Sequence, residues 1–358
     1  MEGRRIFQLL AGYSNGDAIS NEARVMRAIF RGWGAQSEIV CEPQLILPEL
    51  IDDAWALERY RAAARADDIL ILHLSIGTLI NRVFAELPGR KIILYHNITP
   101  PHFFRGIKEQ TARRLAEGRD DMRALAGVAE VNLADSAFNA GELEEVGYRA
   151  VHVFPLVLKL EDLSDASDPA VLEEYGDERP TILFVGRGVP NKCIDDLLYA
   201  FHYYQRFHAP AARFVHVGSY SGMEFYKWHI ITISRQLGLQ NVELAESVRQ
   251  DELNAYFACA DLFLSMSEHE GFGIPLIESM VHDLPVLAYS AAAVPETLDG
   301  AGVLFAEKRF ELIAAMIDRM VRDRELRQRV IAGQRSRLQR YRQRDLESEL
   351  RRHLEPLL

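Results

Sequence analysis

Carboxylates that could do chemistry stand in one glycine-containing segment, residues 267–278. Glu270 begins a Glu-Gly-Phe-Gly-Ile-Pro run, and Glu278 follows it with seven residues in between. Glycines let a backbone approach a ligand closely, and Pro275 suits the first turn of a helix, whose free N–H groups favour a phosphate or a polar sugar. Two acids at this spacing arise often by chance, and the surrounding glycines and proline make the pattern specific. We expect Glu270 in a loop and Glu278 in the first helical turn, each accepting a hydrogen bond from a different hydroxyl-bearing part of one ligand.

Two cations form a second candidate group, in the run Phe-Val-Gly-Arg-Gly-Val-Pro-Asn-Lys at 184–192. The run approaches the Gly-x-Gly-x-x-Gly dinucleotide fingerprint, but Asn191 occupies the third glycine position. Arg187 stands at an expected strand end and Lys192 at an expected helix start. There the guanidinium fork and the ammonium point charge could neutralise a diphosphate. Taken alone, the pair is equally well explained as two surface cations.

Other candidates stand at the ends of apolar runs. His96 closes the run 91–96 and opens His-Asn-Ile-Thr-Pro-Pro, and His73, near the end of the run 68–74, is its weaker rival. A histidine that merely caps a strand is the alternative for both. In the second half, Gly218 opens Gly-Ser-Tyr-Ser-Gly, which could line a ligand site or form a plain turn.

Short apolar runs alternate with longer helical patterns along the chain, which is typical of parallel strands covered by helices. The expected strands of the first half are 6–10, 37–41, 68–74, 91–96, 130–134 and 151–154, and a helix is expected at 20–33. Those of the second half are 180–186, 213–218, 241–245, 261–265, 285–288 and 303–305, with helices at 192–207 and 222–237. The alternation predicts an α/β protein of two doubly wound, Rossmann-like units, in which ligands bind beyond the carboxyl ends of the strands.

An acidic and polar stretch at 159–179 interrupts this pattern and is interpreted as the connection between domains. We predict a first domain over 1–160 and a second over 161–340. A C-terminal helix over 341–358 is expected to pack near the first domain.

The composition excludes several classes of protein. The chain has 358 residues, of which 48% are apolar, enough for two folded domains. The net charge of -11 disfavours nonspecific nucleic-acid binding. Cys41, Cys193 and Cys259 are widely spaced, which indicates free thiols in a reducing compartment. No stretch approaches the roughly 20 apolar residues of a membrane span.

Basic residues gather in the segment 103–125, which holds Arg105, Lys108, Arg119 and Arg123. One unbroken helix there would present them together, and such a face could rest on an anionic membrane. Gly118 is expected to break the helix, and a solvated face is the preferred explanation.

The second half resembles the retaining glycosyltransferases of family 4 (glycosyl transferases group 1), which have the GT-B fold. The resemblance runs from about 181 to 305 and is weaker over the first 160 residues. It is carried by Gly186-Arg187 with Lys192, by Glu270-Gly271-Phe272-Gly273 with Glu278, and by Pro-Val-Leu-Ala at 285–288 with Val-Pro-Glu at 294–296.

This resemblance implies a role for each candidate. Arg187 and Lys192 would hold the donor diphosphate. Glu270 would contact the transferred sugar, and Glu278 would bind the nucleotide ribose. His96 resembles a family histidine near the reaction centre. The catalytic set is therefore Glu270, Arg187, Lys192 and His96, and the donor site adds Gly16 (in the loop 12–17), Gly218, Gly271, Phe272, Gly273 and Ile274.

The implied activity is that of a retaining, metal-independent hexosyltransferase with a nucleotide sugar as co-substrate and no cofactor. GDP-mannose is the first candidate donor and a UDP-sugar the second. The expected acceptor is a glycan or a lipid-linked glycan of cell-surface polysaccharide, lipopolysaccharide or glycolipid synthesis. A cytoplasmic location is expected, with contact to the inner face of the plasma membrane left open. A non-catalytic nucleotide-sugar-binding partner and a GT-B-like epimerase or phosphorylase are the alternatives.

Overall fold

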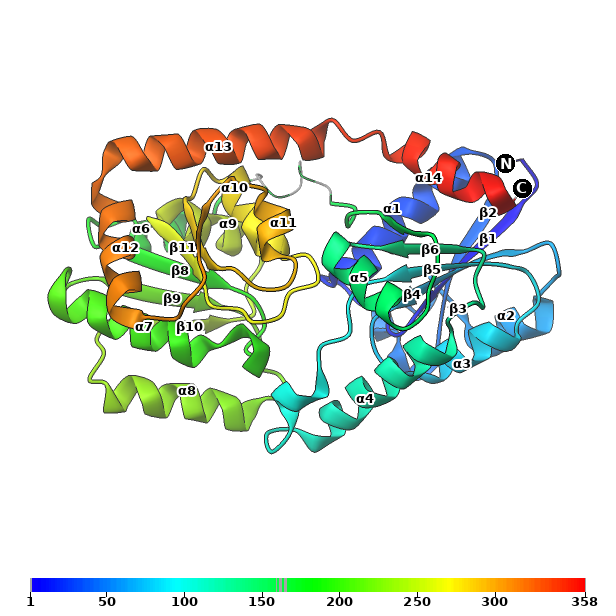
Figure 1. Cartoon of the computed structure of the whole chain (residues 1–358), viewed down its shortest axis with the longest axis horizontal. Coiled ribbons are helices and arrows are strands. Elements are labelled where there is room, and N and C mark those ends of the chain that lie inside the picture. Colours follow the sequence, from blue (N-terminus) through cyan, green and yellow to red (C-terminus); the bar gives the residue numbers. More distant parts are fainter. Residues whose placement is uncertain (1, 159, 161–162, 164–165, 358) are drawn as a thin grey trace. The chain divides into compact units, whose positions relative to one another are not determined.

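The computed structural model describes residues 2–158, 160, 163 and 166–357, and the chain forms two compact units (Figure 1). The first unit comprises Met1–Arg105, Glu109–Leu158 and Asp345–Leu358, and the second comprises Gly106–Lys108 and Lys159–Arg344. Gly106–Lys108 lies inside the predicted first domain but groups with the second unit, where Lys108 Nζ donates to the carbonyl oxygen of Gly222.

A parallel sheet of seven strands, in the order β3-β2-β1-β4-β5-β6-β7, forms the centre of the first unit. Its strands are β1 (Arg5–Leu10), β2 (Gln36–Cys41), β3 (Trp55–Ala56), β4 (Ile69–Leu74), β5 (Arg90–Tyr95), β6 (Val131–Ala134) and β7 (Val151–Val153). Every residue of β1 and β4 is buried, as expected for central strands of a sheet that is covered on both faces.

Helices cover both faces of this sheet (Figure 1). They are α1 (Ala18–Gly32), α2 (Leu57–Ala63), α3 (Leu79–Glu86), α4 (Glu109–Ala124), α5 (Ala137–Glu145) and α14 (Leu346–Leu354). Met26 and Phe30 of α1 share one hydrophobic cluster with Leu350 and Leu354 of α14 and with sheet residues such as Ile71. The C-terminal helix therefore completes the core of the first unit.

A second parallel sheet, of six strands in the order β10-β9-β8-β11-β12-β13, forms the centre of the second unit. Its strands are β8 (Thr181–Val185), β9 (Arg213–Val217), β10 (Val242–Glu246), β11 (Leu262–Ser265), β12 (Val286–Tyr289) and β13 (Val303–Phe305). Its helices are α6 (Pro169–Tyr175), α7 (Ile194–Phe207), α8 (Glu224–Gln236), α9 (Gln250–Cys259), α10 (Ile274–Val281), α11 (Val294–Leu298), α12 (Phe310–Arg322) and α13 (Arg324–Arg342).

Strand order reverses once in each sheet, between β1 and β4 and between β8 and β11. At such a point the crossover connections leave in opposite directions and open a crevice at the carboxyl ends of the two strands. The segments that follow these four strands therefore occupy the positions at which doubly wound sheets bind ligands.

One local expectation was wrong, and one segment contains a helix that the sequence did not predict. The stretch 159–179 contains helix α6, because Asp168 accepts hydrogen bonds from the N–H groups of Ala170 and Val171 and Pro169 opens the helix. Gly118 does not break the helix of segment 103–125 but lies inside α4.

The structure explains Gly118 by packing rather than by a turn. A Cβ atom on Gly118 would lie 2.5 Å from the backbone nitrogen of Gly77, so only a glycine admits this close approach. The basic residues of α4 are partly neutralised, since Arg119 pairs with Glu142 at 2.5 Å and Arg123 pairs with Asp120.

None of the helices in the described part of the chain combines the length and the apolar composition that a membrane crossing requires. The three cysteines are free thiols, with Cys41 and Cys193 buried and Cys259 partly buried.

Candidate functional site

The loops after β8 and β9 are joined by backbone hydrogen bonds and by a close backbone approach at their glycines. The N–H of Gly186 donates to Val217 (2.9 Å), and the N–H of Gly188 donates to Ser219 (2.9 Å). Gly218 has φ +157°, and a Cβ there would lie 1.8 Å from the carbonyl oxygen of Gly186. The structure thus brings Gly186 and Gly218 together, and a side chain on Gly218 would force the two loops apart.

Arg187 and Lys192 differ in their surroundings. Arg187 is exposed, and its guanidinium makes no hydrogen bond or ion pair with any described residue. Lys192 ends a 3₁₀ turn, Pro190–Lys192, and its ammonium contacts Glu270 Oε1 at 2.5 Å. The structure therefore pairs one predicted cation with one predicted carboxylate and leaves the other cation available to an anionic ligand.

The segment 267–273, after β11, is held against the β8 loop. Asn191 Nδ2 donates to the carbonyl oxygen of His269 (3.0 Å), and the N–H of Glu268 donates to the carbonyl oxygen of Asn191 (2.9 Å). Asn191, which breaks the dinucleotide fingerprint, is therefore the residue that joins the two candidate segments.

Helix α10 begins without a side-chain cap, at Gly273, whose φ is +90°. The N–H groups of Gly271, Phe272 and Gly273 donate to no acceptor within the described residues. Ile274 is the first helical residue, and Pro275 follows it. The start of this helix is consequently an uncapped set of donors, as an anion-binding helix terminus requires.

Glu278 is the fifth residue of α10, in its second turn and not in the first as expected. Its side chain is buried, and burial raises the pKa of its carboxyl to about 7. Its carboxylate accepts no hydrogen bond from the described residues. A buried carboxyl in this state lacks the donor that its ionised form would need.

A supporting ion cluster lies beneath the same loops. Lys308 Nζ contacts Asp196 at the start of α7 and Glu268 in the β11 loop, both at 2.7 Å. Burial alone would lower the pKa of Lys308, but the two carboxylates outweigh it and raise that pKa. Lys308 therefore ties the β11 loop to α7. The sequence offered no spacing signal for it.

A buried histidine of β9 also supports the site. His216 Nε2 lies 2.8 Å from the carbonyl oxygen of Gly186, and His216 Nδ1 lies 2.9 Å from the hydroxyl of Tyr220. Burial lowers the pKa of His216 to about 4, despite the favourable bond to Gly186. The neutral ring therefore donates to Gly186 and accepts from Tyr220. The ring of Tyr220 in turn packs where a Cβ of Gly188 would stand, at 2.2 Å.

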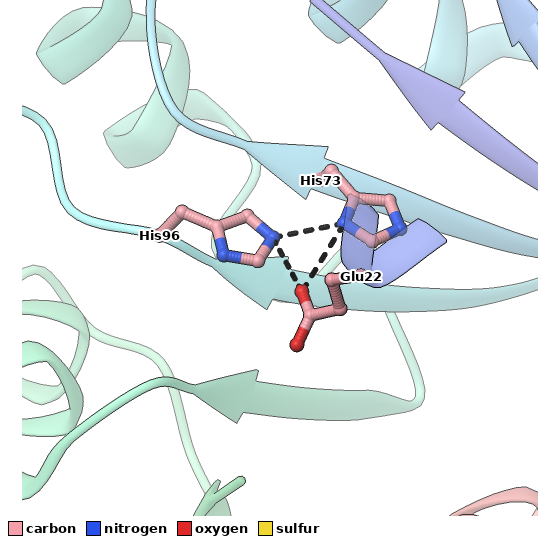
Figure 2. A group of neighbouring side chains, drawn as sticks. All are labelled: Glu22, His73 and His96. Carbon is pink, nitrogen blue, oxygen red and sulfur yellow. Dashed lines mark hydrogen bonds and ion pairs between the residues drawn. The ribbon is translucent and has the colours of Figure 1, made fainter. Parts of the chain in front are cut away.

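In the first unit, His73 and His96 come together although they were considered as rivals (Figure 2). His73 Nδ1 lies 2.8 Å from His96 Nε2, and both rings are buried. His96 Nδ1 lies 3.0 Å from Asp135 Oδ2. Glu22 of α1 completes the group, with Oε2 3.5 Å from His96 Nε2 and 3.8 Å from His73 Nδ1. Sequence reading missed Glu22 and Asp135, although Asp135 directly follows β6.

Gly16 lies in the loop between β1 and α1, with φ +70°, and a Cβ atom added to it would have no other atom within 4 Å. The next residue, Asp17, caps α1 by accepting from the N–H of Ser20 at 2.9 Å. Gly16 is therefore an exposed residue directly before the capped start of α1, at the carboxyl end of β1.

These positions can be compared with known proteins. Residues 171–337 match the family model described as "Glycosyl transferases group 1", and this range holds the β8, β9 and β11 loops described above. The central part of the second unit is therefore similar to the group 1 glycosyltransferases. The resemblance that its Arg-Lys and Glu-x7-Glu motifs predicted is thereby confirmed.

Two curated relatives share stretches of this chain. An uncharacterized 41.2 kDa protein in the cps region of Klebsiella pneumoniae is 26% identical over 248 residues, which are 64% of this chain and 62% of that protein. A GDP-mannose-dependent alpha-(1-6)-phosphatidylinositol monomannoside mannosyltransferase of Mycobacterium tuberculosis is 27% identical over 158 residues, 41% of this chain and 40% of that protein. The chain thus matches less than two thirds of the length of these relatives.

The likeness in fold extends beyond residues 171–337. The sucrose-phosphate synthase of Thermosynechococcus elongatus superposes with a TM-score of 0.75 and 14% identity, covering 99% of this chain and all of that one. With two parallel, doubly wound sheets, this likeness confirms the predicted GT-B fold class.

Proposed function

We propose that this chain is a retaining hexosyltransferase that moves a sugar from a nucleoside diphosphate to a glycan or a lipid-linked acceptor. The observation that carries the proposal is the set of groups around the β8 and β11 ends: an unpaired guanidinium, a Lys–Glu pair, an uncapped helix start and a buried carboxyl. A nucleotide sugar offers a partner to each of them. It has two phosphates for the cations and the N–H groups, and hydroxyls for the carboxylates.

The diphosphate is assigned to Arg187 and Lys192. Negative charge grows on the leaving phosphate as the bond to the anomeric carbon breaks, so fixed cations nearby lower the barrier. The same stabilisation of phosphate charge is assigned to the N–H groups of Gly271, Phe272 and Gly273 and to the first helical turn, which begins at Ile274. Side chains and backbone would supply this charge stabilisation without a metal ion. Gly218 is assigned to the same ligand as a position of close backbone approach, and the donor role of Gly16 stays a prediction from the sequence.

The sugar and the ribose are assigned to the two glutamates. Glu270 forms an ion pair with Lys192. When the donor binds, Glu270 would instead accept hydrogen bonds from the sugar hydroxyls, and Lys192 would bind the diphosphate. Glu278 would accept from the ribose hydroxyls, which supply the donors that its buried carboxyl lacks.

Retention of the anomeric configuration is proposed through front-side attack, in which the departing phosphate takes the proton of the acceptor hydroxyl. The mannosyltransferase relative makes GDP-mannose the first candidate donor, and a UDP-sugar is the second. The relative in a cps region and the lipid acceptor named for the mannosyltransferase favour polysaccharide, lipopolysaccharide or glycolipid synthesis.

The assignment is tested with Arg187→Ala and Lys192→Ala, assayed by donor turnover with GDP-mannose and UDP-glucose. Each variant should lose at least about 10²-fold in turnover, the order lost when one preorganised electrostatic contact is removed. Arg329→Ala is the matched control, because Arg329 is an exposed arginine of α13 in the same unit with no hydrogen bond or ion pair to any described residue. Unchanged turnover in both site variants would refute the diphosphate assignment.

A second experiment addresses Glu278. Glu278→Gln keeps the side-chain volume but removes the charge, and we expect weaker binding of the nucleoside diphosphate with little change in the fold. Isothermal titration with GDP and UDP measures this affinity. Unaltered affinity for both nucleotides would remove Glu278 from the ribose site.

A further inference from the structure

The buried histidine pair of the first unit lies in a chain of hydrogen bonds with defined directions. At one end, Gln8 Nε2 donates to the carbonyl oxygen of Ala23 at 2.8 Å, which fixes the orientation of the amide. Gln8 Oε1 then faces His73 Nε2 at 3.0 Å. Because an amide oxygen only accepts, His73 Nε2 must carry the proton of that bond.

The direction of this first bond determines the second. Burial lowers the pKa of His73 well below its usual value, and the charge of His96 lowers it further, so His73 is neutral. With its proton on Nε2, its Nδ1 is a bare acceptor. His96 Nε2 lies 2.8 Å away and must donate. At its other nitrogen, His96 Nδ1 faces the Asp135 carboxylate at 3.0 Å, which also requires a donor.

We propose that His96 is held as an imidazolium at neutral pH by acceptors on both of its ring nitrogens, and that it acts as a positioning residue and not as a general base. Gln8 and His73 present one acceptor, and Asp135 presents the other. The role in turnover rests on the proposed function, whereas the charge state rests on the directions of the hydrogen bonds together with the neutrality of His73.

Charge balance around the ring supports this state. The carboxylates of Asp17 and Glu22 face His96 from the start of α1, and Asp135 faces it from the end of β6, while neutral His73 faces it from β4. Burial alone would lower the pKa of His96, but the three carboxylates outweigh it and raise that pKa to about 9. A neutral His96 would leave these acids without a cation in a buried place.

A metal ion is the competing occupant, since Glu22, His73 and His96 each offer one ligand atom within 4.8 Å of the others. Zinc bonds of about 2.0–2.1 Å in a tetrahedral site hold their ligand atoms roughly 3.3 Å apart. The two ring nitrogens are closer, at 2.8 Å, which is a hydrogen-bond length. The ring planes are also parallel to within 2°, with centroids 5.0 Å apart.

His96 itself begins the turn that follows β5. Asn97, the next residue, has φ +74°, and its amide donates to Asn139 (2.8 Å) and Glu142 (3.1 Å). The turn lies at the carboxyl edge of the sheet, next to the strand-order reversal of the first unit. There a buried positive charge would favour an anionic ligand at this edge of the sheet.

Ring-nitrogen NMR of the full chain labelled with ¹⁵N-histidine tests the charge state. His96 is assigned by the signal lost in His96→Gln, and His73 by the signal lost in His73→Gln. Between about pH 6 and pH 8, where an ordinary histidine titrates, His96 should show two protonated nitrogens and no titration. His73 should show one protonated and one bare nitrogen. A bare nitrogen on His96 at pH 7 would overturn the proposal.

Zinc sulfate added to the same sample separates the two occupants. Unchanged signals and no retained zinc after dialysis support the imidazolium. One equivalent of zinc retained by the wild type and lost from His73→Gln would overturn it in favour of a metal centre.

Asp135→Asn connects the charge to turnover. The amide oxygen still accepts from His96 Nδ1, but without the negative charge the pKa of His96 should fall into the range of about pH 6–8. Donor turnover of the variant should then fall about tenfold per pH unit above that pKa, whereas the wild type should show no such limb below about pH 8. Asp121→Asn is the control, because Asp121 bonds Asn81 outside the network. A variant whose His96 titrates in NMR without a matching limb in turnover would overturn the positioning role and leave the diphosphate assignment intact.

Discussion

The two units each bury a histidine beside a central strand end, and the two rings differ in charge. His216 of the second unit has one acceptor and one donor as neighbours, the Gly186 carbonyl and the Tyr220 hydroxyl. His96 of the first unit has two acceptors, His73 and Asp135. A neutral imidazole satisfies the first pair, and only an imidazolium satisfies the second. The partners of a buried histidine, and not burial alone, therefore decide its charge.

The same difference separates what the two rings can do. His216 fixes a backbone carbonyl and a tyrosine ring, and so it sets the shape of the loop that carries Arg187. His96 sets the local charge as well as the local shape. Three experiments on stability test this difference between the two rings.

The largest effect is expected from removing each ring. His96→Gln leaves buried carboxylates without their cation and should lower the free energy of unfolding by about 3–5 kcal/mol. His216→Gln should cost about 1–3 kcal/mol, the penalty of a weakened neutral hydrogen bond to a buried carbonyl. Urea unfolding followed by circular dichroism compares the two variants at pH 7.

The chain offers a probe for the first unit alone. Trp33 and Trp55 lie in the first unit and Trp228 in the second. In a Trp228→Phe background, tryptophan fluorescence therefore reports the unfolding of the first unit. A loss in His96→Gln no larger than that in His216→Gln would contradict the charged ring.

The pH dependence of stability should be opposite for the two rings. The folded-state pKa of His96, about 9, exceeds its unfolded value of about 6.5. Its contribution is therefore full below about pH 6.5 and is lost as the pH rises to about 9, on the order of 3 kcal/mol. The folded-state pKa of His216, about 4, is lower than its unfolded value. Its contribution is lost as the pH falls from about 6.5 to about 4.

Unfolding free energies measured from about pH 4 to about pH 9 test these two losses of stability, the alkaline limb of His96 and the acid limb of His216. His96→Gln should flatten only the alkaline limb, and His216→Gln only the acid limb. The opposite assignment, or no change in either limb, would show that the two charge states are misassigned.

The smallest effect concerns the loop that His216 supports. Gly218→Ala places a methyl group against the Gly186 carbonyl oxygen and should cost about 1–3 kcal/mol beyond its control, as overpacking does. Gly300→Ala is that control, because Gly300 also has a positive φ, +80°, but no atom within 4 Å of its Cβ position. Thermal unfolding compares the two. Equal losses would mean that the loops yield without strain.

Much of this fold could be predicted from the sequence, because buried parallel strands are continuous apolar runs. The run at 68–74 became β4 and the run at 261–265 became β11, each within one residue at either end. The two-residue strand β3 and helix α6 were not predicted, since neither has enough residues to establish a hydrophobic periodicity. The close approach of Gly118 to Gly77 depends on tertiary packing that no local pattern records.

The candidate site divides in the same way. Arg187, Lys192 and Glu270 belong to short segments that end strands, so their spacing predicted their common edge. Glu22 and Asp135 are separated from His96 by 74 and 39 positions, counting along the printed sequence, and only the folded sheet joins them. The sequence therefore shows only separate histidines, whereas in the structure they belong to one hydrogen-bond network.

Helix α14 has a consequence for synthesis on the ribosome. Leu350 and Leu354 belong to the core cluster that also holds Ile71 and Phe30, yet they are translated after the whole second unit. The first unit therefore cannot complete its hydrophobic core, and part of its apolar face stays uncovered, until residues 346–354 have been translated. The second unit can mature while the chain is still being made, so the half that is translated first is the half that is completed last.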